Sequence, residues 1–145
     1  MKHYTLATLA VGITESFETQ VTAEMMQKFC DVTGDISPIH MDEAYAQQHG
    51  YAGRVVYGML SASLFSTLAG VYLPGETCLL HSVESKFVKP VYIGDVLTVS
   101  GKVQEIHEAF EEIVIRGTIV NQKGEKVVRG IIKAGVRPDA KEASL

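Results

Sequence analysis

The sequence has no tryptophan, four prolines and only two cysteines, Cys30 and Cys78. The cysteines lie far apart, and neither belongs to a C-x-x-C pair nor has a histidine-rich neighbourhood. Zinc sites and disulfide-stapled scaffolds need closer or more numerous cysteines. We therefore expect two free thiols in a reducing compartment, and no metal.

Targeting and membrane-spanning patterns are also missing. The first residues contain no long apolar segment followed by a small-residue cleavage site. The longest helical apolar stretch, Met59 to Leu73, is interrupted by three serines and a glycine. It is too short and too polar for a membrane span, which takes about 20 residues. These absences predict a cytoplasmic protein with no membrane partner.

Positive charge is scarce. The chain has 13 Lys and Arg against 17 Asp and Glu, giving a net charge of −4 without any basic run. This balance argues against nucleic acid as a partner. Hydrophobic residues make up 46% of the 145 residues, which is enough for the core of one domain. We expect a single domain over residues 1–145, with 137–145 as a flexible polar tail.

The amino-terminal third predicts an extended segment followed by a helix. Residues 4–20 are typical of extended or loop structure, and they alternate in polarity near their end. Thr22 is suited to cap the start of a helix, because its hydroxyl can accept from a backbone N–H of the first turn. Apolar residues then recur at helical spacing, and Gly34 is suited to end the helix.

A bend follows this helix. Residues 35–40 are predicted as a loop, because Pro38 cannot continue a helix and favours an extended residue before it. Asp42 can cap a short helix over 43–46, which Gly50 ends. Residues 51–57 are predicted as a connection.

A second, longer helix is predicted to start at Gly58 and to end at Pro74-Gly75. Its residues are apolar or small nearly all round, and it carries no Asp or Glu. A helix with this composition is usually buried. It is therefore expected to form the centre of the fold.

The remaining sequence is strand-like. Alternating segments at 82–88, 96–103, 112–120 and 126–136 predict consecutive antiparallel strands, with a turn at 121–124. The natural arrangement is an α+β fold in which the sheet curls around the buried helix, and dimerisation can cover the sheet edges. Several cations on or beside these strands are expected to be solvated: Lys86, Lys89, Arg116, Arg129 and Lys133.

Asp35 and His40 are the candidate catalytic residues. A carboxylate and an imidazole together can bind a water and transfer its proton. Taken singly, each has an ordinary structural role, since Asp is common in turns and His is often packed or solvated. Asp42 is best explained as a helix cap. The pair His40/Asp42 lacks the further ligands that a metal site needs.

The start of the second helix is a candidate oxyanion site. The N–H of Gly58 has no partner within its helix, and the helix dipole adds positive potential at this end. Both features suit a carbonyl that gains negative charge. Ser61, Ser63 and Ser66 follow it without a G-x-S-x-G motif. They are expected to bond to backbone carbonyls, although one of them could contact Asp35 or a substrate.

Two motifs resemble those of a known family. Residues 31–42, Asp-Val-Thr-Gly-Asp-Ile-Ser-Pro-Ile-His-Met-Asp, resemble the hydratase motif of the MaoC-like (R)-specific enoyl-CoA hydratases. Residues 56–66, Val-Tyr-Gly-Met-Leu-Ser-Ala-Ser-Leu-Phe-Ser, resemble their second signature, and 86–95 resemble the strand and turn that follow it. The resemblance spans residues 12 to 136.

The resemblance implies a hot-dog fold, in which a long central helix is wrapped by an antiparallel sheet, and a homodimer. It implies reversible syn addition of water to a trans-2-enoyl-CoA, without a cofactor. Asp35 and His40 match the family's catalytic pair, Gly58 its oxyanion donor and Ser66 its supporting serine. The chain departs from the family at Ser37, where Asn is usual, and at Tyr57, where His is usual.

Three other functions stay open at this point. A hot-dog thioesterase needs a carboxylate on or near the central helix, and residues 58–73 contain none. A dehydratase acting on acyl carrier protein needs a basic surface, and no basic run indicates one. A non-catalytic acyl-CoA-binding module would have no need of both Asp35 and His40. The sequence does not indicate which of these two residues is the base.

Overall fold

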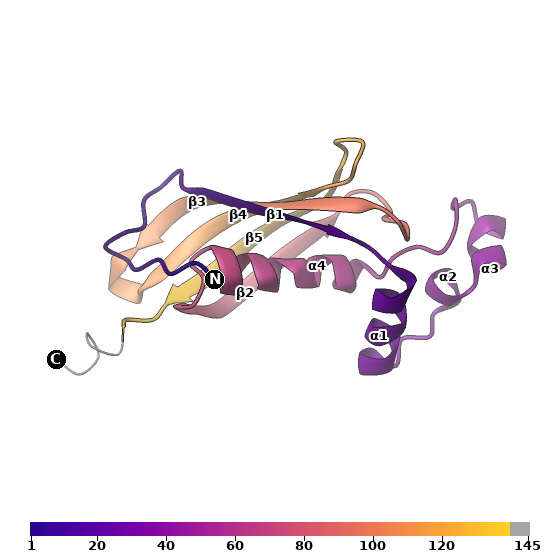
Figure 1. Ribbon diagram of the computed structural model, residues 1–145, viewed down its shortest axis with the longest axis horizontal. Coiled ribbons are helices and arrows are strands. Elements are labelled where there is room, and N and C mark those ends of the chain that lie inside the picture. Colours follow the sequence, from indigo (N-terminus) through magenta and orange to yellow (C-terminus); the bar gives the residue numbers. More distant parts are fainter. Residues whose placement is uncertain (140–145) are drawn as a thin grey trace.

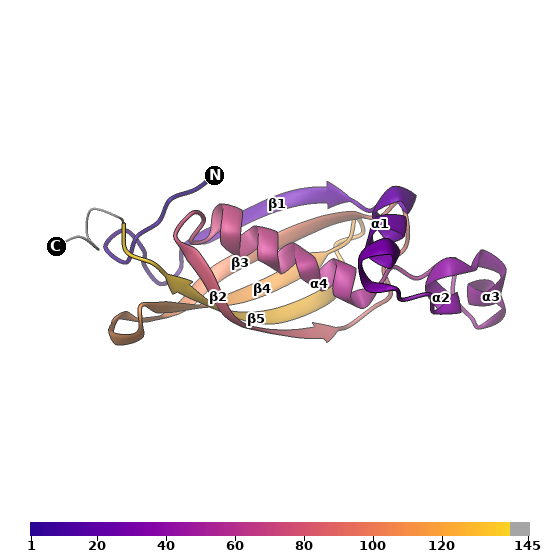
Figure 2. The same cartoon turned by 90° about the horizontal axis from the view of Figure 1, so that it is seen from below.

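A single antiparallel sheet curls around one buried helix. The computed structural model describes residues 1–139. The strands are β1 (Thr14–Gln20), β2 (Cys78–Phe87), β3 (Val96–His107), β4 (Glu112–Val120) and β5 (Lys126–Val136), in the spatial order β1-β3-β4-β5-β2 (Figure 1). Helix α4 (Gly58–Thr67) runs along the inner face of this sheet and continues as a π-helical turn, η1 (Leu68–Tyr72) (Figure 2). This is the predicted hot-dog arrangement.

Three short helices lie at one end of the sheet. They are α1 (Ala23–Thr33), α2 (Pro38–Met41) and α3 (Glu43–Gln48), and α2 and α3 project beyond the sheet in both views (Figures 1 and 2). A 3₁₀ turn, η2 (Glu108–Phe110), joins β3 to β4. Within residues 1–139, none of the helices has the length and apolar character that a membrane crossing requires.

The core lies between α4 and the inner face of the sheet. Phe65, Leu68 and Ala69 are fully buried on the helix. The sheet alternates beneath them, so that Leu97, Val99 and Val103 of β3 are also fully buried while their neighbours are more exposed. Burial of a large apolar side chain contributes about 1.5–3 kcal/mol, which makes this interface the main source of stability.

Glycines in the sheet make room for the helix. Gly117 of β4 and Gly130 of β5 are directly paired, and a Cβ on either would lie 2.6 Å from a ring carbon of Phe65. Gly101 of β3 is related in the same way to Leu68, with a Cβ distance of 2.8 Å. Because no side chain fits between them, the helix approaches the sheet more closely than larger residues would allow.

The predicted strands and caps largely match the structure. Thr22 caps α1 by accepting from the N–H of Met25, and Gly34 ends it in the left-handed region. Strands β4 and β5 have the predicted limits. Strands β2 and β3 are longer than predicted, since β2 begins at Cys78 and β3 extends to His107 beyond a bulge. Both extensions have few buried residues, so periodicity does not reveal them.

One local prediction is wrong. Residues 35–40 are not all loop, because α2 begins at Pro38 and includes His40. Proline is tolerated at the first position of a helix, because the N–H that it lacks would have no acceptor within the helix there. Asp42 does cap α3, as predicted, by accepting from the N–H of Tyr45.

The carboxyl-terminal tail is described only in part. Within the predicted tail 137–145, Arg137 donates its backbone N–H to the Thr77 carbonyl and a guanidinium N–H to the Glu76 carbonyl, both at 2.8 Å. Residues 140–145 lie outside the described residues. The flexibility of the tail therefore stays a prediction.

The close approach of Phe65 predicts that Gly130→Ala destabilises the fold. The added methyl must displace a buried ring, and overpacking of this kind typically costs about 1–3 kcal/mol. Urea unfolding should show the loss, and Phe65→Leu should reduce it in a double-mutant cycle. Gly70→Ala is the matched control, because a Cβ there meets nothing within 4 Å. An unchanged Gly130→Ala midpoint would contradict the packing argument.

Candidate active site

One groove brings together the residues that the sequence singled out. Asp35, His40, Gly58 and Ser66 all line a cavity of about 870 Å³ between α4 and β2. They come from the turn after α1, from α2 and from two positions of α4. The opposite wall includes Val83 and other apolar side chains of β2. The predicted candidate residues therefore share one site.

The Asp35 carboxylate is held by the turn in which it lies. Its Oδ1 accepts from the Ser37 backbone N–H at 3.0 Å and from the Ser37 hydroxyl at 2.5 Å. These two donors, led by the hydroxyl, hold the pKa of Asp35 below its ordinary value, and the charge of His40 acts in the same direction. Asp35 is therefore a carboxylate, and so a hydrogen-bond acceptor, at neutral pH.

The His40 imidazole has a defined tautomer. Its Nδ1 lies 2.6 Å from the carbonyl oxygen of Val55, which can only accept, so Nδ1 is the donor. In the neutral ring this leaves the lone pair on Nε2. The backbone is fixed as well, because Arg54 Nε donates to the His40 carbonyl at 2.7 Å. The segment that carries Arg54 and Val55 thus holds both the ring and the backbone of His40.

Tyr57 connects the two candidate catalytic residues. Its hydroxyl donates to the Asp35 carbonyl oxygen at 2.6 Å, and its ring centroid lies 4.3 Å from that of His40. Phe29 is the second aromatic neighbour, with its ring centroid 4.7 Å from that of Tyr57. The side chain is 1% exposed, and burial, followed by a hydrogen bond with Cys30, raises the pKa of Tyr57 to about 12. The sequence marks Tyr57 only as a departure from the usual His, and these contacts come from residues distant in the chain.

Gly58 opens α4 directly after Tyr57. As the first helical residue it has an N–H without an intrahelical acceptor, and it lines the same cavity as Asp35 and His40. A Cβ at this position would lie 3.1 Å from the Phe87 ring. The absence of a side chain therefore lets a ligand approach this N–H while Phe87 stays in place.

The three serines of α4 differ in their surroundings. Ser66 is exposed and lines the groove. Ser63 donates to the Leu60 carbonyl at 2.6 Å, as expected of a helical serine. Ser61 does not follow the expectation, because its buried hydroxyl has no hydrogen-bond partner.

A second cavity adjoins the groove. It measures about 300 Å³ and is lined by His40, Gly58 and Phe87, which also line the groove, together with Ser61 and Lys89. The start of α4 thus lies at the boundary between two spaces.

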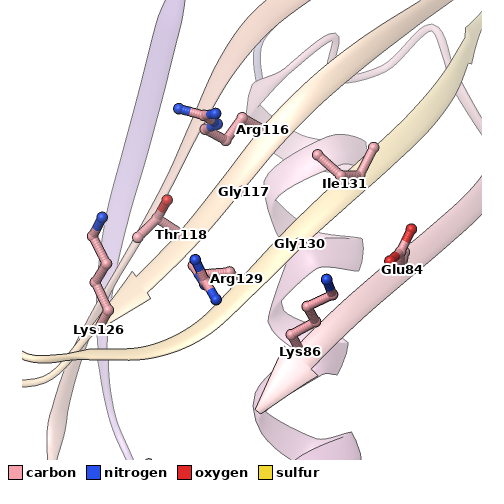
Figure 3. A pocket seen from close by; sticks show the side chains of 9 residues that line it. All are labelled: Glu84, Lys86, Arg116, Gly117, Thr118, Lys126, Arg129, Gly130 and Ile131. Atoms are coloured by element: carbon pink, nitrogen blue, oxygen red, sulfur yellow. The ribbon is translucent and has the colours of Figure 1, made fainter. Parts of the chain in front are cut away.

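The outer face of the sheet carries a separate, cationic hollow of about 290 Å³. Lys86, Arg116, Lys126 and Arg129 surround it, and Gly117 and Gly130 form part of its floor (Figure 3). Strand pairing brings these cations together, although they are scattered in the sequence. A basic surface therefore exists even though the sequence has no basic run. The cations are exposed, as predicted. The hollow lies across the sheet from α4 and from Asp35 and His40.

Among residues 1–139, no three or more His, Cys, Asp and Glu side chains gather closely enough to hold a metal ion. The two cysteines are free thiols. The groups that the groove offers for chemistry are the carboxylate, the imidazole, the hydroxyls and the backbone N–H described above.

Known proteins share both the sequence pattern and the fold. Residues 9–124 match the MaoC-like domain, so the chain belongs to this family. It is 31% identical over 122 residues to the (R)-specific enoyl-CoA hydratase of Aeromonas caviae, covering 84% of this chain and 91% of that one. It is 34% identical over 98 residues to a 3-hydroxybutyryl-CoA dehydratase of Methylorubrum extorquens, covering 68% of this chain and 62% of that protein's length.

Solved structures agree with these relatives. An unliganded R-hydratase of Pseudomonas aeruginosa superposes with a TM-score of 0.86 at 30% identity, covering 92% of this chain and 85% of that chain. The R-hydratase of A. caviae gives 0.85 at 29% identity, covering 89% and 98%. The protein is a hot-dog member of a family of hydratases and dehydratases, which are hydro-lyases.

The turn geometry predicts that Ser37→Ala raises the pKa of Asp35. The substitution removes the hydroxyl that contributes most to stabilising the charged carboxylate, while the backbone N–H of residue 37 remains. An NMR titration of the side-chain carboxyl carbon should therefore show an upward shift toward the ordinary value. Ser16→Ala, on the outer face of the sheet, is the control that should leave the titration of Asp35 unchanged. A downward shift in Ser37→Ala would contradict this account.

Proposed function

We propose that this protein is an (R)-specific enoyl-CoA hydratase, which adds water reversibly and syn to a trans-2-enoyl-CoA to give the (R)-3-hydroxyacyl-CoA. The observation that carries the proposal is the joint presence of the Asp35 carboxylate, the His40 ring and the Gly58 N–H on one cavity wall. The hydratases and dehydratases among its relatives support the same reaction class.

The protonation states suit the binding of one water. Asp35 is ionised, and in the neutral ring the contact with Val55 leaves the lone pair of His40 on Nε2, so both groups can accept. A water has two O–H donors, and it can donate one to each acceptor. Its oxygen lone pair then remains available for attack on C3 of the substrate. General acid–base assistance of this kind contributes about 10²–10⁴-fold.

The reaction balances with these groups alone. The water oxygen bonds to C3, one water proton stays on the new hydroxyl, and the other reaches C2 on the same face through Asp35 or His40. Both groups can reach the same water, so we assign the transfer to the pair rather than to one residue. Meanwhile the substrate carbonyl gains negative charge, which the Gly58 N–H stabilises. One such donor contributes about 3 kcal/mol. Ser66, also on the groove, is the supporting hydroxyl.

The competing functions have less support. A thioesterase would need a carboxylate on or near the central helix; α4 and η1 contain none, and we assign the nearby Asp35 carboxylate to activation of the water. The cationic outer face favours an acidic carrier protein as a second candidate partner, but it lies across the sheet from the groove (Figure 3). A binding module without catalysis would not require the tautomer of His40 and the charge of Asp35 to be set as they are. We propose acyl-CoA as the substrate and no nucleic-acid partner.

We further propose that the protein acts as a homodimer in the cytoplasm, without a cofactor. β2 is an edge strand, and Leu79, Leu80, Val83 and Phe87 on it are 37–57% exposed. A second copy that covers this edge would close the groove and would give α2 and α3, which project beyond the sheet, a surface to pack on (Figure 2). The free thiols support a reducing compartment.

Hydration of crotonyl-CoA tests the reaction. Asp35→Asn keeps the size of the side chain but removes its charge, so we expect kcat to fall by roughly 10²–10⁴-fold. Loss of enoyl absorbance and release of free thiol should be followed together, with chiral analysis of the product. Asp42→Asn, which changes a helix cap outside the groove, is the matched control. Thiol release, or an active Asp35→Asn, would refute the proposed reaction.

The dimer is tested at the β2 edge. Val83→Glu places a charge among exposed apolar side chains, so we expect light scattering to show a shift toward monomer. Ser100→Glu, on the outer face of the sheet, should leave the molecular mass unchanged. A wild-type protein that is monomeric and fully active at micromolar concentration would exclude the proposed assembly.

A further inference from the structure

Ser61 lines the second cavity, and its hydroxyl is buried and unpaired. The residue is 2% exposed, and its Oγ has no hydrogen-bond partner. Its neighbours on the cavity wall include Val56, Val91 and Val128, which offer no side-chain acceptor. A buried polar group without a partner lowers stability. Helix packing alone therefore does not explain a serine at this position.

A helical serine has an alternative that Ser61 does not use. Two residues further along α4, Ser63 donates to the Leu60 carbonyl, and this satisfies its hydroxyl within the helix. Ser61 makes no such bond. Its hydroxyl is closed off in this rotamer and has no partner, and a rotation about χ1 would present it to a group that enters the cavity.

The position of the second cavity indicates which group this is. The groove and the second cavity share His40, Gly58 and Phe87, so they meet where the Gly58 N–H receives the thioester carbonyl. A thioester has two arms, which leave the carbonyl carbon in different directions. The groove, walled by Val83, Phe87 and other apolar side chains, suits the acyl arm. The second cavity is left for the thiol arm.

The second cavity has a mixed polar and apolar lining, which suits an amide-bearing chain. Besides Ser61, Tyr51 and Lys89 line it, whereas most of the rest is apolar. The thiol arm of CoA alternates short apolar segments with amides, and its first amide lies a few atoms from the sulfur. A hydroxyl can donate to an amide carbonyl or accept from an amide N–H.

We propose that the second cavity binds the pantetheine arm of the substrate and that the Ser61 hydroxyl hydrogen-bonds to an amide of that arm. The inference rests on the proposed thioester substrate, and it adds a binding residue outside the set Asp35, His40, Gly58 and Ser66. Ser61 thus contributes to recognition of the thiol portion rather than to the chemical step.

A series of crotonyl thioesters tests the role of Ser61. Crotonyl-CoA and the crotonyl thioester of N-acetylcysteamine keep the first amide, whereas S-ethyl thiocrotonate has none. In Ser61→Ala, kcat/KM should fall roughly 3–10-fold for the first two, the effect of one hydrogen bond, and should stay unchanged for the third. Equal losses on all three thioesters, or no loss on any, would overturn the inference. Ser82→Ala, an exposed serine of β2 outside both cavities, is the control.

The melting temperature distinguishes a hydroxyl that binds ligand from one that stabilises the fold. Because the hydroxyl is unpaired without ligand, ligand-free Ser61→Ala should melt at the wild-type Tm or above it. The rise in Tm that pantetheine produces should shrink in Ser61→Ala and persist in Ser82→Ala. A lower ligand-free Tm in Ser61→Ala would indicate a structural role and contradict the inference.

Calorimetric binding of pantetheine distinguishes failure of this inference from failure of the proposed reaction. If the wild type binds pantetheine, Ser61→Ala weakens that binding and no thioester is hydrated, then the arm site stands and the hydratase assignment fails. If crotonyl-CoA is hydrated but Ser61→Ala binds pantetheine as the wild type does, the hydratase stands and the arm site fails.

Discussion

The contact between Phe65 and two paired glycines determines how the rest of the molecule is arranged. Gly117 and Gly130 leave the space that the ring fills, so the helix lies close against the sheet and the sheet curls around it. Since α4 is then held along its length, its first turn has a fixed position at the end of the sheet. Gly58, Ser61 and Ser66 are displayed from this turn and the two that follow. The site is therefore positioned by core packing some distance from the reacting groups.

A second constraint, local to the site, is the buried phenol of Tyr57. It joins the turn of Asp35 to the start of α4 and packs on the ring of His40. A phenol with a pKa of about 12 remains a protonated hydrogen-bond donor at neutral pH, where Asp35 is ionised. The hydrogen bond that joins the Asp35 turn to α4 is therefore kept while the site is active.

Much of the fold follows from local sequence signals. The caps at Thr22 and Asp42, the limits of β4 and β5 and the buried character of α4 all depend on short-range patterns that physical rules describe well. The helix at Pro38 was missed because a proline that ends one helix can equally begin another. The full length of β2 was missed because an edge strand with few buried residues has no clear alternation.

The candidate site divides in the same way. Residue chemistry indicated Asp35, His40 and Gly58, the resemblance to the MaoC-like hydratases implied Ser66, and the structure places all four on one groove. Spacing could not reveal the tautomer of His40, which depends on the carbonyl of Val55, fifteen residues away. Nor could it reveal the unpaired hydroxyl of Ser61, because neighbours from other segments decide whether a helical serine is satisfied.

The cations of the outer face give the molecule an uneven charge distribution. Lys86, Lys102, Arg116, Lys126 and Arg129 line the two hollows of that face, against the carboxylates of Glu15 and Glu84. The chain as a whole has a net charge of −4, so the excess of carboxylates lies elsewhere on its surface. A charged matrix interacts with the nearest face of a protein rather than with its average. In ion-exchange chromatography near neutral pH, the protein should be retained by cationic resin and also by anionic resin at low salt, although its isoelectric point of about 5.7 alone would indicate only the former.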